Sequence, residues 1–567
     1  MNLFFVRKAE MKEVLVKNTA LKLLFITSFL LVGLFHEYTA CLFLALEFIY
    51  LGYLFYKQDI YVFDNLNFIF MIFIIFMYLF VSFFAIDQGM AIIGFFKQLS
   101  ILMFIIILMQ FDKQDRKELL FIIPYMAILM MGVSVASYII KPLQDYFLVN
   151  GRIGGFFQYP NTFALFLLVS LVVVYKNKEK YFHTNVFFPL LIIGIVLTGS
   201  RTAYILTVLL FVYIIKNNQE YLKVLLPSVL LIVAVIVLFL VLNIDTKVFK
   251  RITQFTLSSS TLLGRLLYYK DGLKTLISHP LGTGYLGFYF LEPSIQTGVY
   301  SIRYIHNDIL QLALDVGIIP CLMFISIIVT SLISESIEED NKLIIILIVL
   351  HSLFEFNLQY ISIFLILVIC LDLYDGKQTK FISFNHRIMG RSFIILSTLC
   401  SFYLSISMSF RYFNNNDLSI KLLPIYTEAK LTKLQYVSNV KEAVKLAKSV
   451  EKYDSNIASI YDVYALNEMQ KKNYNQMISY KEQSLQLQKY NMEAYDSYIS
   501  MLTICVNCYQ NDENLQSQYV QKIKEVPTTL DNLKKDTDHL AFKIHDKPTF
   551  KLSKQSQKII KLVNKNN

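Results

Sequence analysis

Residues 66–86 are LNFIFMIFIIFMYLFVSFFAI, a stretch of twenty-one residues without a charged side chain. A helix of that length, at about 1.5 Å per residue, crosses the roughly 30 Å hydrocarbon core of a bilayer. Long apolar runs recur at 119–140, 222–242 and 308–333, and the 567-residue chain has a mean hydropathy of +0.50 with only 17% charged residues. This composition excludes an ordinary soluble protein and predicts an all-α polytopic membrane protein.

Apolar stretches between charged residues predict about 12–13 transmembrane helices. They lie at 21–35, 41–56, 66–86, 91–110, 119–140, 162–175, 186–199, 202–215, 222–243, 308–333, 343–356, 359–374 and 392–410. The loops on the side of the N-terminus hold nineteen Lys and Arg, and the short loops on the other side hold three or four. Because Lys and Arg accumulate in cytoplasmic loops, we expect a cytoplasmic N-terminus and an extracytoplasmic C-terminal domain. The net charge of +11 then reflects mainly topology, and no nucleic-acid partner is expected.

Two segments are predicted to lie outside the bilayer, both on the extracytoplasmic side. The loop 244–307 is far longer than the usual connection between bundled helices, which indicates that it has structure and a function of its own. Residues 411–567 contain 23 basic and 17 acidic residues in 157 positions, against 30 and 25 in the first 410, so a domain boundary falls near 410. In this second segment, Lys452-Tyr453-Asp454 and Lys489-Tyr490-Asn491 each follow a helical stretch, thirty-seven residues apart. Such a period predicts either tetratricopeptide-like (TPR-like) helix pairs or a plain helical bundle.

Charged residues inside apolar segments are informative because an Arg near the bilayer centre costs about 2.5–3.5 kcal/mol. Arg201 lies where two short apolar stretches, 186–199 and 202–215, meet in the sequence Thr198-Gly199-Ser200-Arg201-Thr202. It would sit below the outer surface at a helix break, which suits an anion such as a diphosphate. The alternative is an Arg that extends to the membrane interface without a ligand.

Two further segments hold candidate site residues. Arg152 to Asn161 contains two glycines and a proline just before a predicted helix, which fits either a ligand-binding loop or a simple turn. The long loop contains Gly264-Arg265, a Gly/Pro turn at 279–284, and the sequence Arg303 to Asn307. Within it, His306 is a candidate general base since an imidazole titrates near neutral pH, although a histidine at a helix start equally suits capping or packing.

Five motifs of the chain resemble, in the same order, those of the O-antigen ligase and O-antigen polymerase superfamily. They are Arg152-x-x-Gly155-x-Phe157-x-x-Pro160-Asn161, Gly199-Ser200-Arg201, Gly264-Arg265, His279-Pro280-x-Gly282-x-Gly284, and His306-Asn307 with Gly317 following. The resemblance covers about residues 60–375 and implies a metal-independent glycosyltransferase that takes glycan from undecaprenyl diphosphate at the outer face of the bacterial cytoplasmic membrane. Pro320, three residues after Gly317, stands where ligases often have Gly, Thr or Tyr. This difference bears on the ligase label more than on the resemblance to the superfamily.

The same resemblance assigns roles to residues. Arg201 and Arg265 would hold the donor diphosphate and His306 would activate the acceptor hydroxyl, which makes these three the catalytic candidates. The further candidates for donor binding are Arg152, Asn161, Lys97, Arg303 and Asn307. No cofactor or metal is expected, because the Asp-x-Asp triplet 536–538 lies in the C-terminal domain, far along the chain from the other polar clusters.

The acceptor stays open at this point. A polymerase would extend another glycan, a ligase would use a lipid or wall acceptor, and a protein O-oligosaccharyltransferase would use a protein hydroxyl bound by the C-terminal domain. A transporter of lipid-linked saccharide is an alternative of a different class, since it could use the same basic cavity.

Overall fold

The computed structural model describes residues 2–181, 184–219, 260–382 and 387–565, together with isolated positions between 222 and 241. The predicted span at 222–243 and the start of the loop 244–307 therefore fall almost entirely outside the described residues. In the part that is described, the chain is all-α apart from two short antiparallel strand pairs. The predicted fold class is confirmed at this level.

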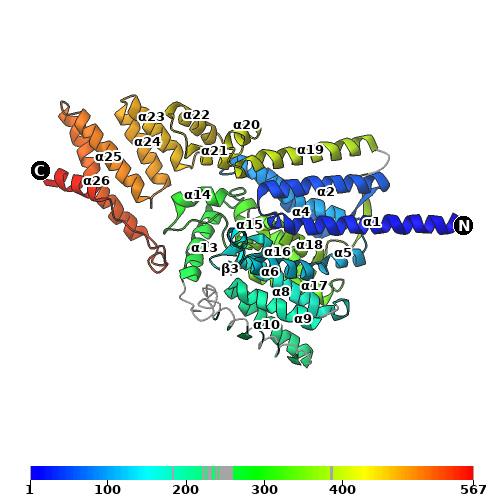
Figure 1. The fold of residues 1–567 in the computed structure, drawn as a ribbon. Coiled ribbons are helices and arrows are strands. Elements are labelled where there is room, and N and C mark those ends of the chain that lie inside the picture. The colour runs from blue at the N-terminus through cyan, green and yellow to red at the C-terminus, as the bar shows by residue number, and fades with distance from the viewer. Residues whose placement is uncertain are drawn as a thin grey trace.

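A bundle of apolar helices forms the larger part of the molecule (Figure 1). Helix α2 packs against α19 and α4, and α8 packs against α9, α6 and α17. The bundle helices are α1 (Asn2–Leu30), α2 (Glu37–Lys57), α3 (Leu66–Val81), α4 (Gln88–Leu108), α5 (Lys113–Leu120), α6 (Ile123–Ala136), α8 (Pro160–Lys176), α9 (Thr184–Thr198), α10 (Arg201–Asn217), α15 (Asp308–Val316), α16 (Ile318–Ile333), α17 (Glu339–Ser352), α18 (Ile361–Cys370) and α19 (Arg387–Tyr412).

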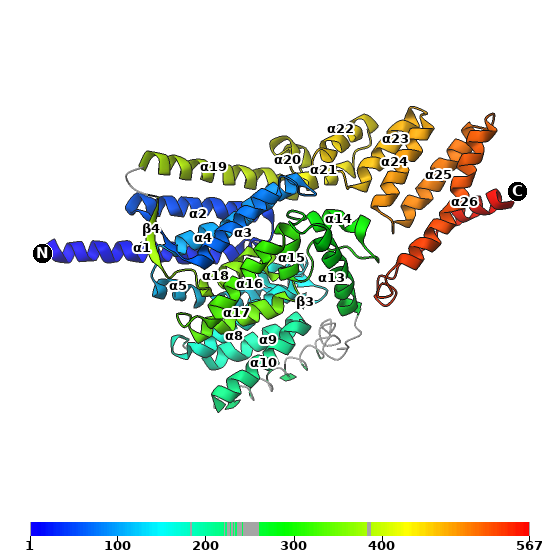
Figure 2. The ribbon, with the colours of Figure 1, turned by 180° about the vertical axis from the view of Figure 1, so that it is seen from behind.

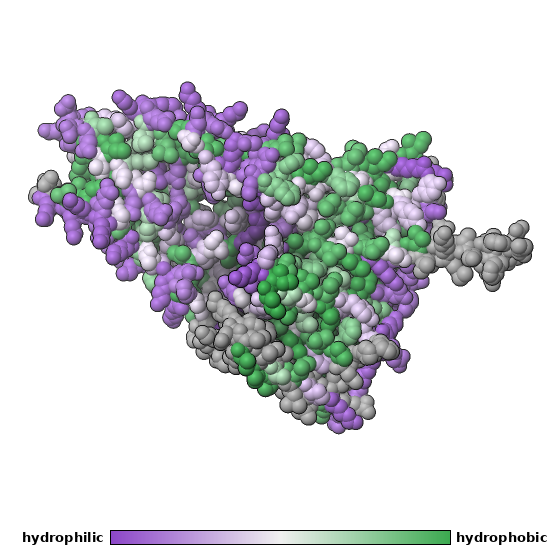
Figure 3. Space-filling view, viewed as in Figure 1, coloured by the Kyte–Doolittle hydropathy of each residue, from purple (hydrophilic) through white to green (hydrophobic). Residues whose placement is uncertain are grey.

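Among the described residues, four helical segments are long and apolar enough to cross a membrane: Glu37–Lys57, Gln88–Leu108, Lys113–Ala136 and Arg387–Tyr412. Shorter apolar helices of 10–17 residues include α3, α8, α16 and α18. Figure 3 shows hydrophobic residues gathered over the bundle, whereas hydrophilic residues cover the C-terminal helices. A soluble monomer rarely exposes so continuous an apolar surface, so the chain is a membrane protein.

The predicted span 308–333 is broken, which corrects the expectation of one continuous helix. Helix α15 ends at Val316 and α16 begins at Ile318, because Gly317 has a φ of 95° that no helix accommodates. The predicted break at 198–202 is confirmed, since α9 ends at Thr198 and α10 begins at Arg201.

The two ends of the chain lie at opposite ends of the molecule (Figures 1 and 2). Near the N-terminal end, β1 (Ile60–Asp64) pairs antiparallel with β4 (Lys377–Ile382), in a register that runs from Ile60 opposite Ile382 to Asp64 opposite Lys377. On the side of the bundle that faces the C-terminal helices lie β3 (Arg152–Ile153), α13 (Ser260–Ser278) and α14 (Gly287–Ile295). The short elements α7 (Gln144–Phe147) and β2 (Leu148–Val149) directly precede β3, and β2 pairs with it.

The C-terminal helical domain follows α19 and projects away from the bundle (Figure 2). Its helices are α20 (Asn416–Leu422), α21 (Thr427–Leu434), α22 (Val440–Glu451), α23 (Ala458–Gln470), α24 (Tyr474–Leu487), α25 (Met492–Cys508), α26 (Glu513–Asp536) and α27 (Lys554–Lys565). Contacts tie it to α13 and to the residues that follow α14. Lys270 on α13 forms an ion pair with Asp538, and the Asp538 amide donates to the Thr297 carbonyl at 2.8 Å. The domain therefore has a defined position against the bundle.

Candidate active site

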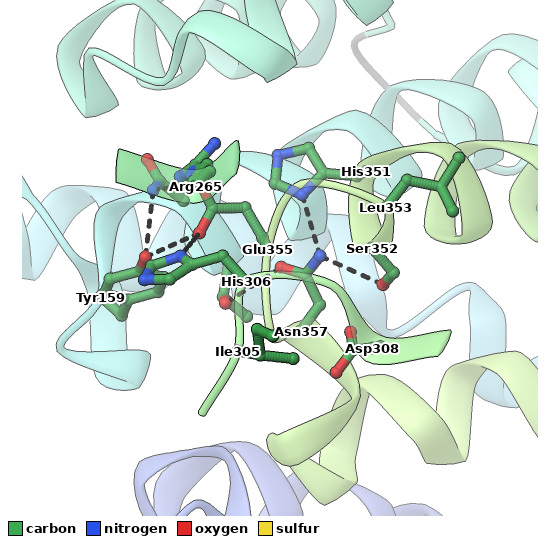
Figure 4. A network of polar contacts seen from close by, with 12 residues as sticks. Tyr159, Arg265, Ile305, His306, Asp308, His351, Ser352, Leu353, Glu355 and Asn357 are labelled. Carbon is green, nitrogen blue, oxygen red and sulfur yellow. Dashed lines mark hydrogen bonds and ion pairs between the residues drawn. The ribbon is translucent and has the colours of Figure 1, made fainter. Parts of the chain in front are cut away.

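One buried carboxylate, Glu355, gathers four side chains from three separate parts of the chain. Its Oε1 accepts from Asn161 Nδ2 at 2.7 Å and forms an ion pair with Arg265 Nη2. Its Oε2 accepts from the Tyr159 hydroxyl at 2.7 Å and lies 3.0 Å from His306 Nδ1. Figure 4 shows Arg265, Tyr159 and His306 directed toward Glu355, whose side chain is only 2% exposed. We call these five residues the Glu355 network.

The break between α17 and α18 positions Glu355. Asn357 in this break donates from Nδ2 to Ser352 Oγ at 3.2 Å, faces His351 Nδ1 at 2.9 Å, and accepts from Thr162 Oγ1 at 3.1 Å (Figure 4). The backbone amide of Leu358 donates to Asp308 Oδ2 at 2.9 Å. These side-chain contacts, together with the hydrogen bond from the Leu358 amide, hold the break in one conformation.

His306 is oriented by its neighbours on both sides. The Tyr269 hydroxyl donates to the His306 carbonyl, and the Phe356 ring meets the imidazole edge-on with centroids 4.9 Å apart. When Nδ1 carries the proton and donates a hydrogen bond to Glu355, Nε2 keeps its lone pair and can accept a proton from a substrate. The His306 side chain is 20% exposed, so the imidazole is held in place but not sealed from a substrate.

Arg152 links this network to the turn before Arg201. Its Nη2 donates to Asn161 Oδ1 at 2.6 Å, and its Nε donates to the Thr198 carbonyl at 2.5 Å. Gly199 has a φ of 62°, and a Cβ there would lie 3.2 Å from the Arg152 guanidinium, so the turn approaches Arg152 closely. Arg201 follows as the first residue of α10 and is partly exposed.

Part of the chain that carries these residues is similar to a known protein family. Residues 186–325 match the family model described as O-Antigen ligase. In this segment the chain is similar to the O-antigen ligase family. Searches of curated proteins and of solved structures gave no match. The matched segment contains Arg201, Arg265 and His306, whereas Arg152, Asn161 and Glu355 lie outside it.

The Gly/Pro turn at residues 279–284 packs on the break between α15 and α16. The amides of Thr283 and Gly284 donate to the carbonyls of Leu314 and Asp315 at 2.6 and 3.0 Å, and the amide of Ile318 donates to the carbonyl of Pro280 at 3.0 Å. A Cβ on Gly282 would lie 2.6 Å from the Asp315 carbonyl oxygen. The glycines of this motif therefore serve close backbone packing, and they support the helix that starts at Asp308.

Three of the predicted donor-binding residues lie apart from the Glu355 network. Asn307 caps α15, with its side chain accepting from the Leu310 amide at 2.9 Å. Lys97 is fully buried, and its Nζ donates to the Phe35 carbonyl at 2.7 Å and to the Tyr285 hydroxyl at 3.3 Å. Arg303 Nη2 forms an ion pair with Glu37 at 2.7 Å. The structure thus places Arg152, Asn161, Arg265 and His306 in one contact network, and Lys97 and Arg303 in a second one.

Glu355 is the site residue that sequence reasoning missed. It lies in the apolar stretch 343–356, where an acidic side chain is as costly as the arginines that were singled out. The same test of burial cost, applied to acidic residues as well as to basic ones, would have found it.

Proposed function

We propose that this protein transfers glycan from an undecaprenyl-diphosphate carrier to an acceptor hydroxyl at the outer face of the bacterial cytoplasmic membrane. The observation that carries the proposal is the convergence of Arg265 and His306, both within the segment that matches the O-antigen ligase model, on one buried carboxylate that lies outside this segment. A cation and an orientable base at one place suit group transfer, whereas a transporter would need a basic lining across the membrane.

In the proposed reaction, the acceptor oxygen attacks the anomeric carbon and the bond from that carbon to the diphosphate oxygen breaks. The acceptor proton passes to His306 Nε2, and Glu355 stabilises the imidazolium that forms. Arg265 and Arg201 stabilise the negative charge on the leaving diphosphate, with Arg152 and Asn161 holding the turn and the carboxylate in position. No metal and no cofactor enter this scheme.

The proposed topology puts the N-terminus in the cytoplasm and the C-terminal domain outside, with about 12–13 crossings. Two loops predicted to be cytoplasmic, near 60 and 377, pair as β1 and β4, and two others are joined by the ion pair of Lys117 with Glu338. Loops on one side of a membrane can meet in this way, so these contacts support the assignment.

The acceptor class is proposed to be a glycan or a lipid, with a protein hydroxyl as the second candidate. A groove of about 600 Å³ between α24, α25 and α26 favours the second candidate, since its lining combines the aromatic residues Tyr495 and Tyr498 with the charged residues Lys489 and Glu525. Helices α22 and α24 start 34 residues apart, as do α23 and α25, which is the period of TPR-like repeats that commonly bind peptides.

Purified protein in nanodiscs, supplied with a lipid-diphosphate-linked glycan, tests the transfer. His306→Ala and Arg265→Ala should each abolish product, while the matched control Lys274→Ala, on the same helix as Arg265, should keep it. Full product from a stable His306→Ala variant would refute the assignment. Loss of glycan from a secreted protein, rather than of polysaccharide or glycolipid, in a deletion strain would favour the protein acceptor.

A further inference from the structure

A second charged network connects the helical domain to the segment that carries His306. Glu37 at the start of α2 accepts from the Tyr285 hydroxyl at 2.7 Å as well as from Arg303. On its other side, Arg303 Nη1 forms an ion pair with Glu428 on α21, and Arg411 at the end of α19 reaches Glu428 Oε2 at 2.9 Å. Charges therefore alternate from Glu37 through Arg303 and Glu428 to Arg411, and we call these four residues the Arg303 network.

Both carboxylates of this network are buried. The side chain of Glu37 is 2% exposed and that of Glu428 is 5% exposed, whereas Arg303 is 29% exposed. A buried carboxylate between two guanidinium groups holds them in place because it compensates both positive charges. Removal of the carboxylate leaves two positive charges facing each other. Without the charge of Glu428, Arg303 and Arg411 would lie side by side with only Glu37 to balance them.

Residues 303–307 are held at every position. The hydroxyls of Tyr304 and Tyr285 are 2.5 Å apart, and the Ile305 amide donates to Gln311 Oε1 at 2.8 Å. The Asn307 amide donates to the Ile305 carbonyl at 2.7 Å. Just before this segment, the Ile302 amide donates to Glu292 Oε2 at 2.9 Å. Arg303 is the residue of the segment that contacts the helical domain, and His306 follows three residues later, so the side chain of Arg303 helps to fix where the segment begins.

We propose that Glu428 of the helical domain is a positioning residue for His306. It holds Arg303, and Arg303 holds the start of the segment that presents the imidazole to Glu355. The helical domain thereby completes the site in the bundle in addition to any acceptor binding. This inference rests on the proposed function for its catalytic consequence, but its structural part does not.

Two measurements on the full chain in nanodiscs test the proposal with Glu428→Gln, which keeps the side-chain shape and removes the charge. Hydrogen–deuterium exchange at the amides of Ile305 and Asn307 should accelerate at least about tenfold, while peptides of α23 and α24 stay at the wild-type rate. Turnover should fall at least about tenfold with little change in KM for the lipid-linked donor, because the base is displaced and the donor contacts are not.

The matched control is Glu442→Gln, which removes an ion pair with Lys433 in the same domain, where the Glu442 side chain is 51% exposed. It should leave exchange and turnover unchanged. The double variant Arg303→Gln/Glu428→Gln should lose no more activity than the worse single variant, because the two residues act as one unit. Wild-type exchange at 303–307 in Glu428→Gln would overturn the proposal. Accelerated exchange in a protein whose wild type makes no product would instead refute the proposed function alone.

Discussion

Replacing Glu355 by Gln is the most informative perturbation of the candidate site. The side chain keeps its size, but one oxygen becomes an NH2 group. Facing Asn161 and Arg265, this group meets two donors and two hydrogen bonds are lost. Facing Tyr159 and His306, it can still donate to the Tyr159 hydroxyl, which already accepts from Asn161 Nδ2 at 3.2 Å. In either orientation the Arg265 charge loses its buried partner.

The magnitude follows from these contacts. Hydrogen bonds to charged groups contribute about 1.5–3 kcal/mol each, and breaking a buried ion pair costs about 3–5 kcal/mol. If about 3–4 kcal/mol of that cost falls on the orientation of His306, the rate drops by roughly 10²- to 10³-fold, since each 1.36 kcal/mol or so is a factor of ten. The rest should appear as a lower unfolding temperature.

Turnover of a lipid-linked donor in nanodiscs measures the first effect and thermal unfolding the second. Glu47→Gln is the matched control: Glu47 on α2 is fully buried, and neither of its carboxylate oxygens has a hydrogen-bond partner among the described residues. Its neutral amide should therefore cost little activity. A Glu355→Gln protein that keeps more than about a third of wild-type turnover would refute the orienting role of the carboxylate.

Three further predictions concern stability and capping. Burial, together with nearby Asp87, raises the pKa of Asp454 to about 7, so the native state binds more protons than the unfolded state between about pH 4 and 7. Stability should fall as the pH rises through this window, and Asp454→Asn should flatten the thermal-unfolding profile; equal slopes would contradict this. Gly317→Ala should destabilise the fold by about 1–3 kcal/mol, measured by thermal unfolding, because the φ of 95° is strained for Ala and its Cβ would lie 2.7 Å from the Leu281 carbonyl carbon. Asn307→Asp should retain activity, since Asp also caps helices, while Asn307→Ala should cost about 1 kcal/mol of stability; a loss of donor affinity in Asn307→Asp would show direct binding instead.

One local feature could be predicted because it depends on nearby sequence. The Gly199-Ser200 break before α10 appears where glycine, charge and apolar length indicated it. The prediction of one continuous helix over 308–333 was wrong, because apolar composition alone does not show that Gly317 adopts a positive φ where it packs against the turn at 279–284. That conformation depends on a contact with a segment more than thirty residues away.

By itself, the sequence determined the all-α membrane class and the similarity to the O-antigen ligase superfamily, because apolar length and motif order are properties of the linear chain. Only the tertiary structure decided the partners of the charged residues. Arg265, His306 and Glu355 are separated by 41 and 49 positions and meet through folding, while Arg303 turns away to Glu37 and Glu428 although it is three residues from His306. A buried charge requires an opposite charge within a few ångströms, and which residues come that close is set by how the helices pack.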